Sequence, residues 1–142
     1  MKLSRQIARI ALGTVLLFAG IGHLTFARAT FQAQVPPWLP LAPDFVVIVS
    51  GVVELGLGIA LIAVKSRRVA AGWLTAAFFL AIFPGNVAQF AEHRDAFGLN
   101  SDEARFIRLI FQPILILWAL WSTGAYQVFK KRYKLSKKGE IK

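Results

Sequence analysis

The residues of this 142-residue sequence with the clearest chemical potential are polar side chains embedded in apolar segments. Glu54 lies near the middle of the stretch 45–64, whose other residues are all apolar or small. A carboxyl group at bilayer depth costs about 2.5–3.5 kcal/mol on insertion scales unless it is paired or protonated. Glu54 is therefore a candidate for ligand binding or proton handling.

Other apolar segments carry polar groups that could hold the polar part of the same ligand. The candidate ligand-binding residues are His23, Glu54, Asn86, Gln89, Arg108 and Gln112. We assign no catalytic residue and predict no metal site, because one histidine and one glutamate are two ligands short of a closed site. The sequence contains no cysteine, which excludes a cysteine nucleophile and thiolate metal ligation.

Each candidate also has a purely structural interpretation. Glu54 can pair with His23 or with an arginine and hold two helices in register through a buried hydrogen bond. The three amide side chains can bond between helices instead of binding a ligand. Arg105 and Arg108 can mark the outer membrane boundary by extending their charged ends to the interface. Alternatively, these two arginines bind an anion or serve as counter-ions for Glu54. His93 is expected in a solvated loop.

Four apolar segments must position these residues. Hydrophobic residues make up 56% of the sequence and the mean hydropathy is +0.57, too apolar for a soluble domain of this size. A helix needs about 20 residues to cross the bilayer, and each of the four segments is long enough. None shows the alternation of apolar and polar residues that is typical of a strand. We predict an all-α four-helix transmembrane bundle as a single domain over 1–128, followed by a basic tail over 129–142. Its spans are 6–27, 45–64, 69–90 and 106–127.

The charge distribution predicts the orientation of these spans. Of 17 Lys and Arg residues, 13 fall in the N-terminal arm, the loop 65–68 and the tail, whereas five of the seven acids flank the opposite ends of the spans. By the positive-inside rule both termini are cytoplasmic, which suits a multi-pass protein of the cell (inner) membrane. The N-terminal segment imitates a signal peptide, and we expect it to remain as the first helix. The net charge of +10 indicates contact of the tail with anionic lipid headgroups, and no nucleic-acid partner is expected.

Helical periodicity brings the candidate residues together. Gly13, Gly20 and His23 share one helix face, and Gly51, Glu54 and Gly58 share another. Small residues let transmembrane helices approach closely, so these faces should point into the bundle. Counted along the helix axes, the polar groups fall between the midplane and the outward side, and the cytoplasmic half is nearly all apolar. We therefore predict a common cavity in the outer half.

Several shorter features carry their own predictions. Pro84 should loosen the third span and free a carbonyl group for another partner. The proline-rich segment 35–40 is either a stiff lid over the bundle or a short connection lying on the bilayer. Asn100 with Glu103 could form a variant capping box at the start of the fourth span. Trp118 and Trp121 are expected to face lipid or the inner interface.

The residues resemble the DoxX family of small bacterial membrane proteins. The resemblance extends over about residues 6 to 124, with the motifs in order and similarly spaced. It is carried by Gly22-His23 with Phe26, by the segments 35–40, 50–58 and 83–86, and by Arg108-Leu109 with Gln112-Pro113. One departure is Gly85, where such families usually have an alanine; we expect only added flexibility there.

The resemblance implies a redox-associated accessory role, because the family takes its name from a subunit of a quinol-oxidising, sulfur-linked system. We expect a quinone-like or other small amphipathic ligand in the outer half, with aromatic walls such as Phe79 and Phe83, and no stand-alone catalysis. A redox partner protein would supply the electrons, and a homodimer is another candidate assembly. Two alternatives remain: a proton-coupled transporter acting as an oligomer, with Glu54 as its protonation site, and a structural scaffold for partner proteins.

Overall fold

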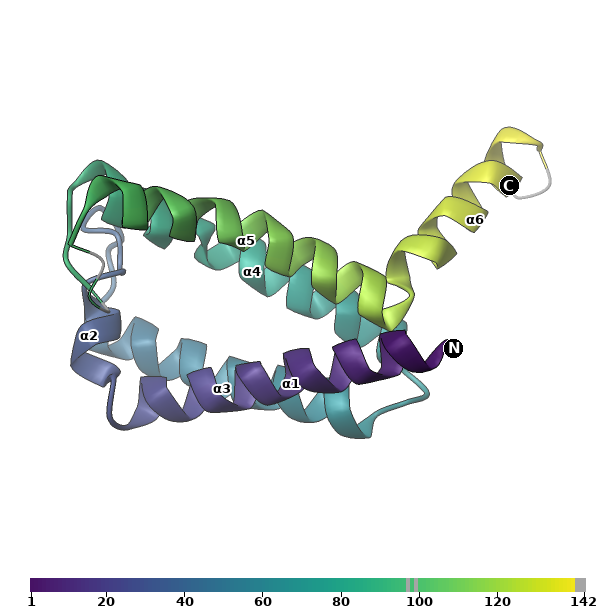
Figure 1. The fold of residues 1–142 in the computed structure, drawn as a ribbon, viewed down its shortest axis with the longest axis horizontal. Helices are drawn as coiled ribbons and strands as arrows, with labels where there is room; N and C mark the ends of the chain where they lie inside the picture. Colours follow the sequence, from purple (N-terminus) through teal and green to yellow (C-terminus); the bar gives the residue numbers. More distant parts are fainter. Residues whose placement is uncertain (97, 99, 140–142) are drawn as a thin grey trace.

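The chain folds into a bundle of helices in the computed structural model, which describes residues 1–96, 98 and 100–139 (Figure 1). Within those residues there are six helices and no strand. They are α1 (Leu3–Leu24), α2 (Arg28–Gln32), α3 (Pro43–Ala63), α4 (Arg68–Ala91), α5 (Asp102–Thr123) and α6 (Ala125–Lys137).

Four of these helices, α1, α3, α4 and α5, are long and apolar enough to cross a membrane. The prediction of an all-α fold with four membrane-length helices is therefore confirmed, and the chain is a multi-pass membrane protein.

The ends of two helices differ from the predicted spans. Helix α1 ends at Leu24 instead of residue 27, and helix α5 runs from Asp102 to Thr123 instead of over 106–127. Gly124 ends α5 because it adopts a left-handed conformation with φ of 81°, which glycine accepts without strain. The predicted basic tail thus begins as a separate helix, α6; residues 140–142 of that tail lie outside the described residues.

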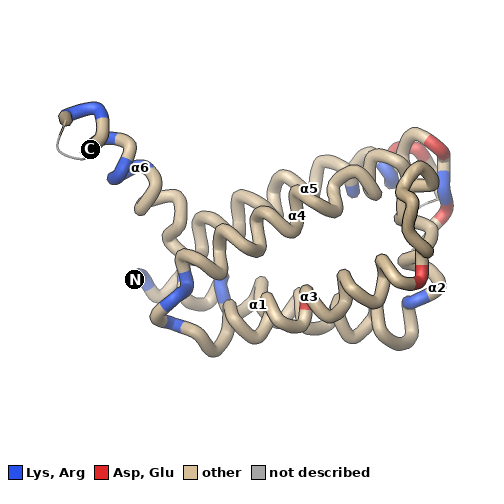
Figure 2. Tube along the Cα trace, turned by 180° about the vertical axis from the view of Figure 1, so that it is seen from behind, with Lys and Arg blue, Asp and Glu red and all other residues tan. Residues whose placement is uncertain are grey.

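The four long helices form two antiparallel pairs, α1 with α3 and α4 with α5 (Figure 1). Residue 1 and the start of α6 lie at one end of the bundle, which we call the terminal end (Figure 1). The opposite end, called the loop end, carries α2, the loop over residues 33–42 and the loop between α4 and α5. Acidic residues gather at the loop end and most basic residues at the terminal end (Figure 2). Apart from acids in the first turns of α3 and α5, the single acid of the four long helices is Glu54, on α3, in the part of the chain that the structure describes.

Glycines bring α1 and α3 into backbone contact at two levels. A Cβ atom added at Gly13 would lie 2.9 Å from the carbonyl oxygen of Gly58, and one at Gly20 would lie 2.8 Å from that of Gly51. Those distances are too short for any larger residue. The glycine faces predicted for these two helices therefore do point into the bundle, and they bring the two backbones close together.

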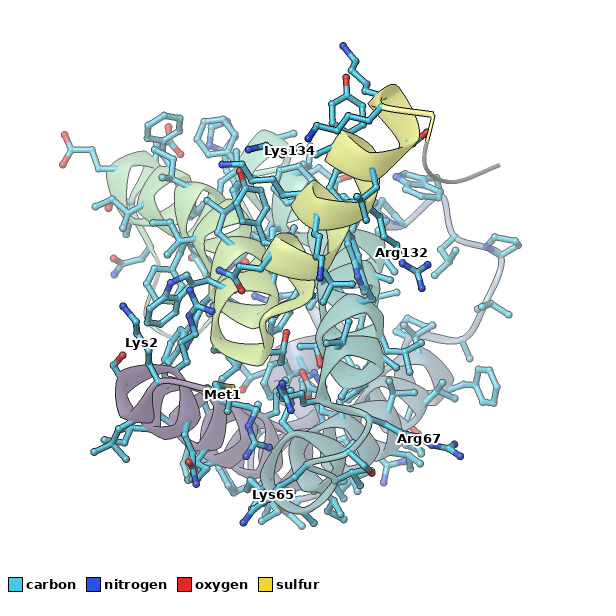
Figure 3. All side chains as sticks on the ribbon, turned by 90° about the vertical axis from the view of Figure 1, so that its right-hand side faces the viewer. Met1, Lys2, Lys65, Arg67, Arg132 and Lys134 are labelled. Atoms are coloured by element: carbon cyan, nitrogen blue, oxygen red, sulfur yellow. The ribbon has the colours of Figure 1, made fainter. Side chains whose placement is uncertain are left out.

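The terminal end is more polar inside than the sequence suggests. Arg9 is almost fully buried and donates a hydrogen bond from Nη1 to the carbonyl oxygen of Leu61, near the end of α3. Trp118, expected to face lipid or the interface, instead donates from Nε1 to the carbonyl oxygen of Ala8 on α1, at 2.9 Å. The prediction of a nearly all-apolar half is wrong in this respect. Lys2, Lys65 and Arg67 lie around the rim of this end (Figure 3).

Candidate ligand cavity

A cavity of about 400 Å³ lies between the two helix pairs, toward the loop end. Residues from all four long helices line it, together with Phe31 of α2 and the loop 33–42. Its polar lining consists of His23, Gln34, Ser50, Glu54, Asn86, Arg108 and Gln112. Its apolar lining includes Val15, Leu16, Phe78, Phe79, Phe111 and Leu115. The cavity therefore presents polar groups and apolar walls to the same space, as a site for an amphipathic molecule would.

Five of the six candidate residues from the sequence line this cavity; the exception is Gln89. Gln89 is buried behind the lining, where its Oε1 atom accepts a hydrogen bond from Nε2 of Gln34 at 2.9 Å. Gln89 therefore holds Gln34, a residue of the lining. Its position does not support the direct contact with a ligand that we predicted. Of the two aromatic walls that we expected, Phe79 lines the cavity and Phe83 is not among the lining residues.

His23 and Glu54 are in contact. Nδ1 of His23 lies 2.7 Å from Oε2 of Glu54 and 2.9 Å from the carbonyl oxygen of Ala19. Because a carbonyl oxygen only accepts, the second contact is satisfied when Nδ1 carries the proton. The ring of His23 also stacks on Phe31, with centroids 3.4 Å apart. Stacking and hydrogen bonding together fix the imidazole against Glu54.

Glu54 is 4% exposed, and its Oε2 atom makes no hydrogen bond of good geometry within the described residues. Nδ1 of His23 carries at most one proton, which cannot be directed fully at both this oxygen and the carbonyl oxygen of Ala19. A buried carboxylate oxygen that lacks a well-aligned donor is costly, because it loses water without full replacement. Glu54 therefore retains hydrogen-bonding capacity for a ligand in the cavity.

A hydrogen-bonded chain links α4 to α5 at the cavity wall. Nδ2 of Asn86 donates to Oε1 of Gln112 at 3.1 Å, and Nε2 of Gln112 donates to the carbonyl oxygen of Phe79 at 2.7 Å. Pro84 lacks the N–H that would bond to the carbonyl group of Leu80, four residues earlier, so the carbonyl of Phe79 is not the one that the proline frees. Both polar atoms of Gln112 take part in these two hydrogen bonds. Asn86 uses only Nδ2, so its Oδ1 atom can accept a hydrogen bond from a ligand in the cavity.

The proline-rich loop covers the loop end of the cavity, in agreement with the interpretation as a lid. Val35 and Pro36 are buried and line the cavity, with Trp38 and Leu39. Nη1 of Arg94 holds the loop by donating to the carbonyl oxygens of Ala33 and Val35, at 3.1 and 2.9 Å.

Gly85 lies directly beneath the loop. A Cβ atom at this position would lie 2.5 Å from the carbonyl oxygen of Gln34, so an alanine requires the loop backbone to shift. The expectation that Gly85 only adds flexibility is wrong. The glycine makes room for the close approach of the lid.

Arg105 and Arg108 do not extend their side chains to the membrane boundary as the structural interpretation supposed. The side chain of Arg105 is 6% exposed and forms ion pairs with Asp95 and Asp102. Arg108 lines the cavity, and its Nη2 atom donates to Oε1 of Gln34 at 3.3 Å. One arginine therefore organises the α4–α5 loop, while the other belongs to the cavity.

The α4–α5 loop tests two further predictions, of which one is wrong and the other is confirmed. The N-cap of α5 is Ser101, whose Oγ accepts a hydrogen bond from the backbone N–H of Ala104 at 3.2 Å, so the predicted capping box at Asn100 is wrong. His93 is exposed, as predicted, and lies 2.7 Å from Asp102.

The sequence analysis missed two residues of the site, Gln34 and Phe31. Gln34 lies between Gln89 and Arg108, and Phe31 covers the ring of His23. Neither residue lies in a membrane span. Phe31 belongs to a short helix and Gln34 to a loop, so no sequence periodicity indicates which way their side chains point. The only available signal was the position of Gln34 directly before the proline-rich segment.

The electrostatic balance of the lining limits the ligand. Among the lining residues, Glu54 and Arg108 are the only acid and the only arginine, and there is no lysine. Their formal charges cancel. A net charge brought into this cavity meets no excess of opposite charge in the lining and loses part of its hydration. An uncharged polar head with carbonyl or hydroxyl groups fits this lining better than an ion does. Within the described residues, no group of three or more His, Cys, Asp or Glu side chains gathers as a metal site.

These features define a four-helix membrane protein with one amphipathic cavity under a proline-rich lid. The chain belongs to the family described as "Domain of unknown function (DUF8561)", whose model matches residues 12–123. The matched region contains most of α1, the whole of α2 to α5, and every cavity-lining residue. No curated protein and no solved structure matches the chain.

Proposed function

We propose that this protein binds an uncharged, amphipathic small molecule, with quinone-like chemistry, in the cavity at the loop end. The observation that carries the proposal is the contact of two buried ionisable groups, His23 and Glu54, at the polar wall of a 400 Å³ cavity. Ionisable groups within membrane spans are costly and are retained where they serve a ligand, a proton or a partner.

The lining supplies what a quinone-like head requires. A carbonyl oxygen of the ligand needs a hydrogen-bond donor, which Arg108 can provide, and a hydroxyl group needs an acceptor, which Glu54 or Oδ1 of Asn86 can provide. Phe78, Phe79 and Phe111 offer apolar surface to the rest of the molecule. The resemblance to the DoxX family supports the same redox-associated, accessory role. The electrons would come from a partner protein, because this chain offers binding and proton groups alone.

The proposed orientation places the terminal end in the cytoplasm of a bacterial cell, with the cavity in the outer half of the inner membrane. The basic residues of the loop 65–68 and of α6 support it through the positive-inside rule. Tyr126, Phe129 and Tyr133 are exposed on α6 among its lysines, which suits contact with anionic headgroups. Because the chain lacks cysteine, single cysteines at Ser66 and Ser101 can test the orientation. A membrane-impermeant maleimide should label only the second in intact cells.

Transport receives less support than binding. A carrier needs a polar path to the other side, but Leu12, Leu61 and Ala119 are fully buried and fill the bundle toward the terminal end. The scaffold alternative remains an outcome of the experiment below.

The test is ligand-dependent thermal stability of the purified protein in detergent, followed by circular dichroism at 222 nm. Decylubiquinone and decanol present uncharged heads, and decanoate presents a charged head on a similar tail. We expect the uncharged compounds to raise the melting temperature of the wild type, since a ligand at 100 times its Kd stabilises by about 2.7 kcal/mol. Decanoate should have little effect.

The informative variant is Glu54→Gln, with Glu103→Gln as the matched control, because Glu103 is exposed and away from the cavity. Stabilisation by decylubiquinone should be lost in the first variant and kept in the second. If no compound stabilises the wild type and Glu54→Gln simply melts earlier, then Glu54 is a structural residue and the scaffold interpretation replaces ligand binding.

A further inference from the structure

We infer that the ligand enters the cavity sideways from the bilayer, and that its apolar tail leaves the bundle between α1 and α5, past Val15 and Phe111. This inference rests on the proposed function and narrows its ligand to a membrane-dissolved molecule with a long tail. A short, water-soluble molecule of the same head chemistry would not need such an opening.

Two of the four sides of the cavity are closed by close helix contacts. The α1–α3 side is sealed by the glycine contacts of Gly20 with Gly51 and of Gly13 with Gly58. The α4–α5 side is sealed by the hydrogen bond from Asn86 to Gln112. Neither side offers a passage without separating the two helices of a pair.

The lid closes the loop end and also lies across the fourth side, between α4 and the start of α3, where Trp38 and Leu39 line the cavity. Gln34 bonds to Gln89 of α4, Gly85 of α4 accommodates the carbonyl group of Gln34, and the loop continues directly into α3 at Pro43. The buried residues Val35 and Pro36 lie on the cavity side of this connection. Direct entry from the aqueous side would require displacing the lid.

The side between α1 and α5 has no comparable closure at the level of the cavity. The two helices are joined near the terminal end, where Trp118 bonds to Ala8 and Arg5 lies 5.9 Å from the ring centre of Trp121. From there they diverge toward the loop end (Figure 1). The bundle is therefore wedge-shaped on this side.

Val15 of α1 and Phe111 of α5 mark the opening. Both residues line the cavity, and both are 50% exposed on the outer surface of the membrane helices. A side chain that contacts both spaces lies at the rim between them. Because both rim residues are apolar, the opening suits an alkyl or isoprenoid chain in contact with lipid.

The size and polarity of the cavity agree with a tail that extends outside it. At about 400 Å³ it is near the small end of the range of about 300–1,000 Å³ for small-molecule sites. The polar residues His23, Gln34 and Arg108 lie toward the loop end, whereas Val15, Leu16 and Leu115 lie deeper. A head bound at the polar end directs its tail toward the apolar rim.

The experiment compares two quinones with the same head, ubiquinone-0 without a tail and decylubiquinone, in the wild type, Val15→Trp and Val52→Trp. Val52 is a valine of α3 that is 57% exposed and does not line the cavity, so its variant controls for a bulky residue facing lipid. We expect Val15→Trp to weaken binding of decylubiquinone at least tenfold and to leave ubiquinone-0 within about twofold. Val52→Trp should change neither.

If Val15→Trp fails to fold, a second measurement tests the same inference. Decylubiquinone with a diazirine at the tail end should crosslink the wild type on lipid-facing residues of α1 or α5, mapped by mass spectrometry. Crosslinks on α3, on α4 or on the lid overturn the inference, as does an equal loss of both quinones in Val15→Trp. A dimer that dissociates in Val15→Trp identifies a second copy as the occupant and also overturns it. If wild type binds neither quinone, the proposed function itself fails.

Discussion

The two helix pairs of this bundle are held together by different means. In the α1–α3 pair, glycines seven residues apart on each helix bring the two backbones into contact, and the side-chain contacts of Arg9 with Leu61 and of His23 with Glu54 add to this packing. In the α4–α5 pair, side chains make the connection: Asn86 bonds to Gln112, and Gln112 bonds to the backbone of α4. The first pair allows no space between its helices, whereas the second places polar side chains at the cavity wall.

This difference indicates a division of roles within the bundle. The glycine pair is a rigid support that presents His23 and Glu54 at a fixed separation. The polar pair contributes groups that can hydrogen-bond either to each other or to a ligand. Between the pairs, α1 and α5 meet only near the terminal end, and the space that remains is the cavity. Three substitutions test this comparison.

The largest expected effect is in the glycine pair. A Cβ at Gly58 would lie 2.8 Å from the carbonyl oxygen of Gly13, so Gly58→Ala must push the two backbones apart. Overpacking of this kind costs about 1–3 kcal/mol, and we expect the melting temperature in detergent to fall accordingly.

The matched control is Gly56→Ala, two residues away on the same helix. Nothing lies within 4 Å of a Cβ at Gly56, so this change should stabilise the helix by about 0.5–1 kcal/mol. If both variants shift the melting temperature in the same direction, close backbone contact does not hold the α1–α3 pair together.

An intermediate effect is expected in the polar pair. Asn86→Leu removes the donor to Oε1 of Gln112 and leaves that buried oxygen without a partner. Interhelical hydrogen bonds in membranes contribute about 0.6 kcal/mol on average and up to about 1.7 kcal/mol, so a loss of about 1 kcal/mol is expected.

The double-mutant cycle with Gln112→Leu isolates the pairwise interaction. Thermal unfolding of the two single variants and the double variant should show a coupling free energy clearly above zero. Additive losses would mean that Asn86 and Gln112 act independently, and the description of α4–α5 as a hydrogen-bonded pair would have to be abandoned.

The smallest effect is expected at the contact that joins the pairs. Trp118→Phe keeps the aromatic ring and removes the hydrogen bond from Nε1 to the carbonyl oxygen of Ala8. A loss of about 0.5–1 kcal/mol is expected, within the net value of one hydrogen bond. Trp73→Phe, at a tryptophan that is 43% exposed on α4, should cause a smaller change. Equal losses in the two variants would show that the Trp118 hydrogen bond does not hold α1 to α5.

Much of this site was predictable from periodicity. The spacing of Gly13, Gly20 and His23 on one helix, and of Gly51, Glu54 and Gly58 on another, identified the two faces that meet in the structure. The contact between His23 and Glu54 was one of the interpretations left open, and coordinates were needed to establish it.

Other parts of the site depend on residues that are remote in the sequence. Gln34 bonds to Gln89, 55 positions away, and to Arg108, 74 positions away. A non-periodic loop carries no information about such partners. Likewise, the sequence shows Arg9 only as one basic residue of the N-terminal arm, and the packing of α1 against α3 buries it against Leu61.

The sequence by itself determined the class of this protein: four apolar helices, their approximate bounds, and the helix faces that turn inward. These follow from local rules, because a helix repeats every 3.6 residues and a bilayer requires about 20 of them. Only the tertiary structure decided that the lid covers the loop end, that Gln89 stands behind the cavity, and that the opening lies between α1 and α5. Those outcomes depend on how several helices pack at once, and packing joins residues whose separation along the chain has no fixed period.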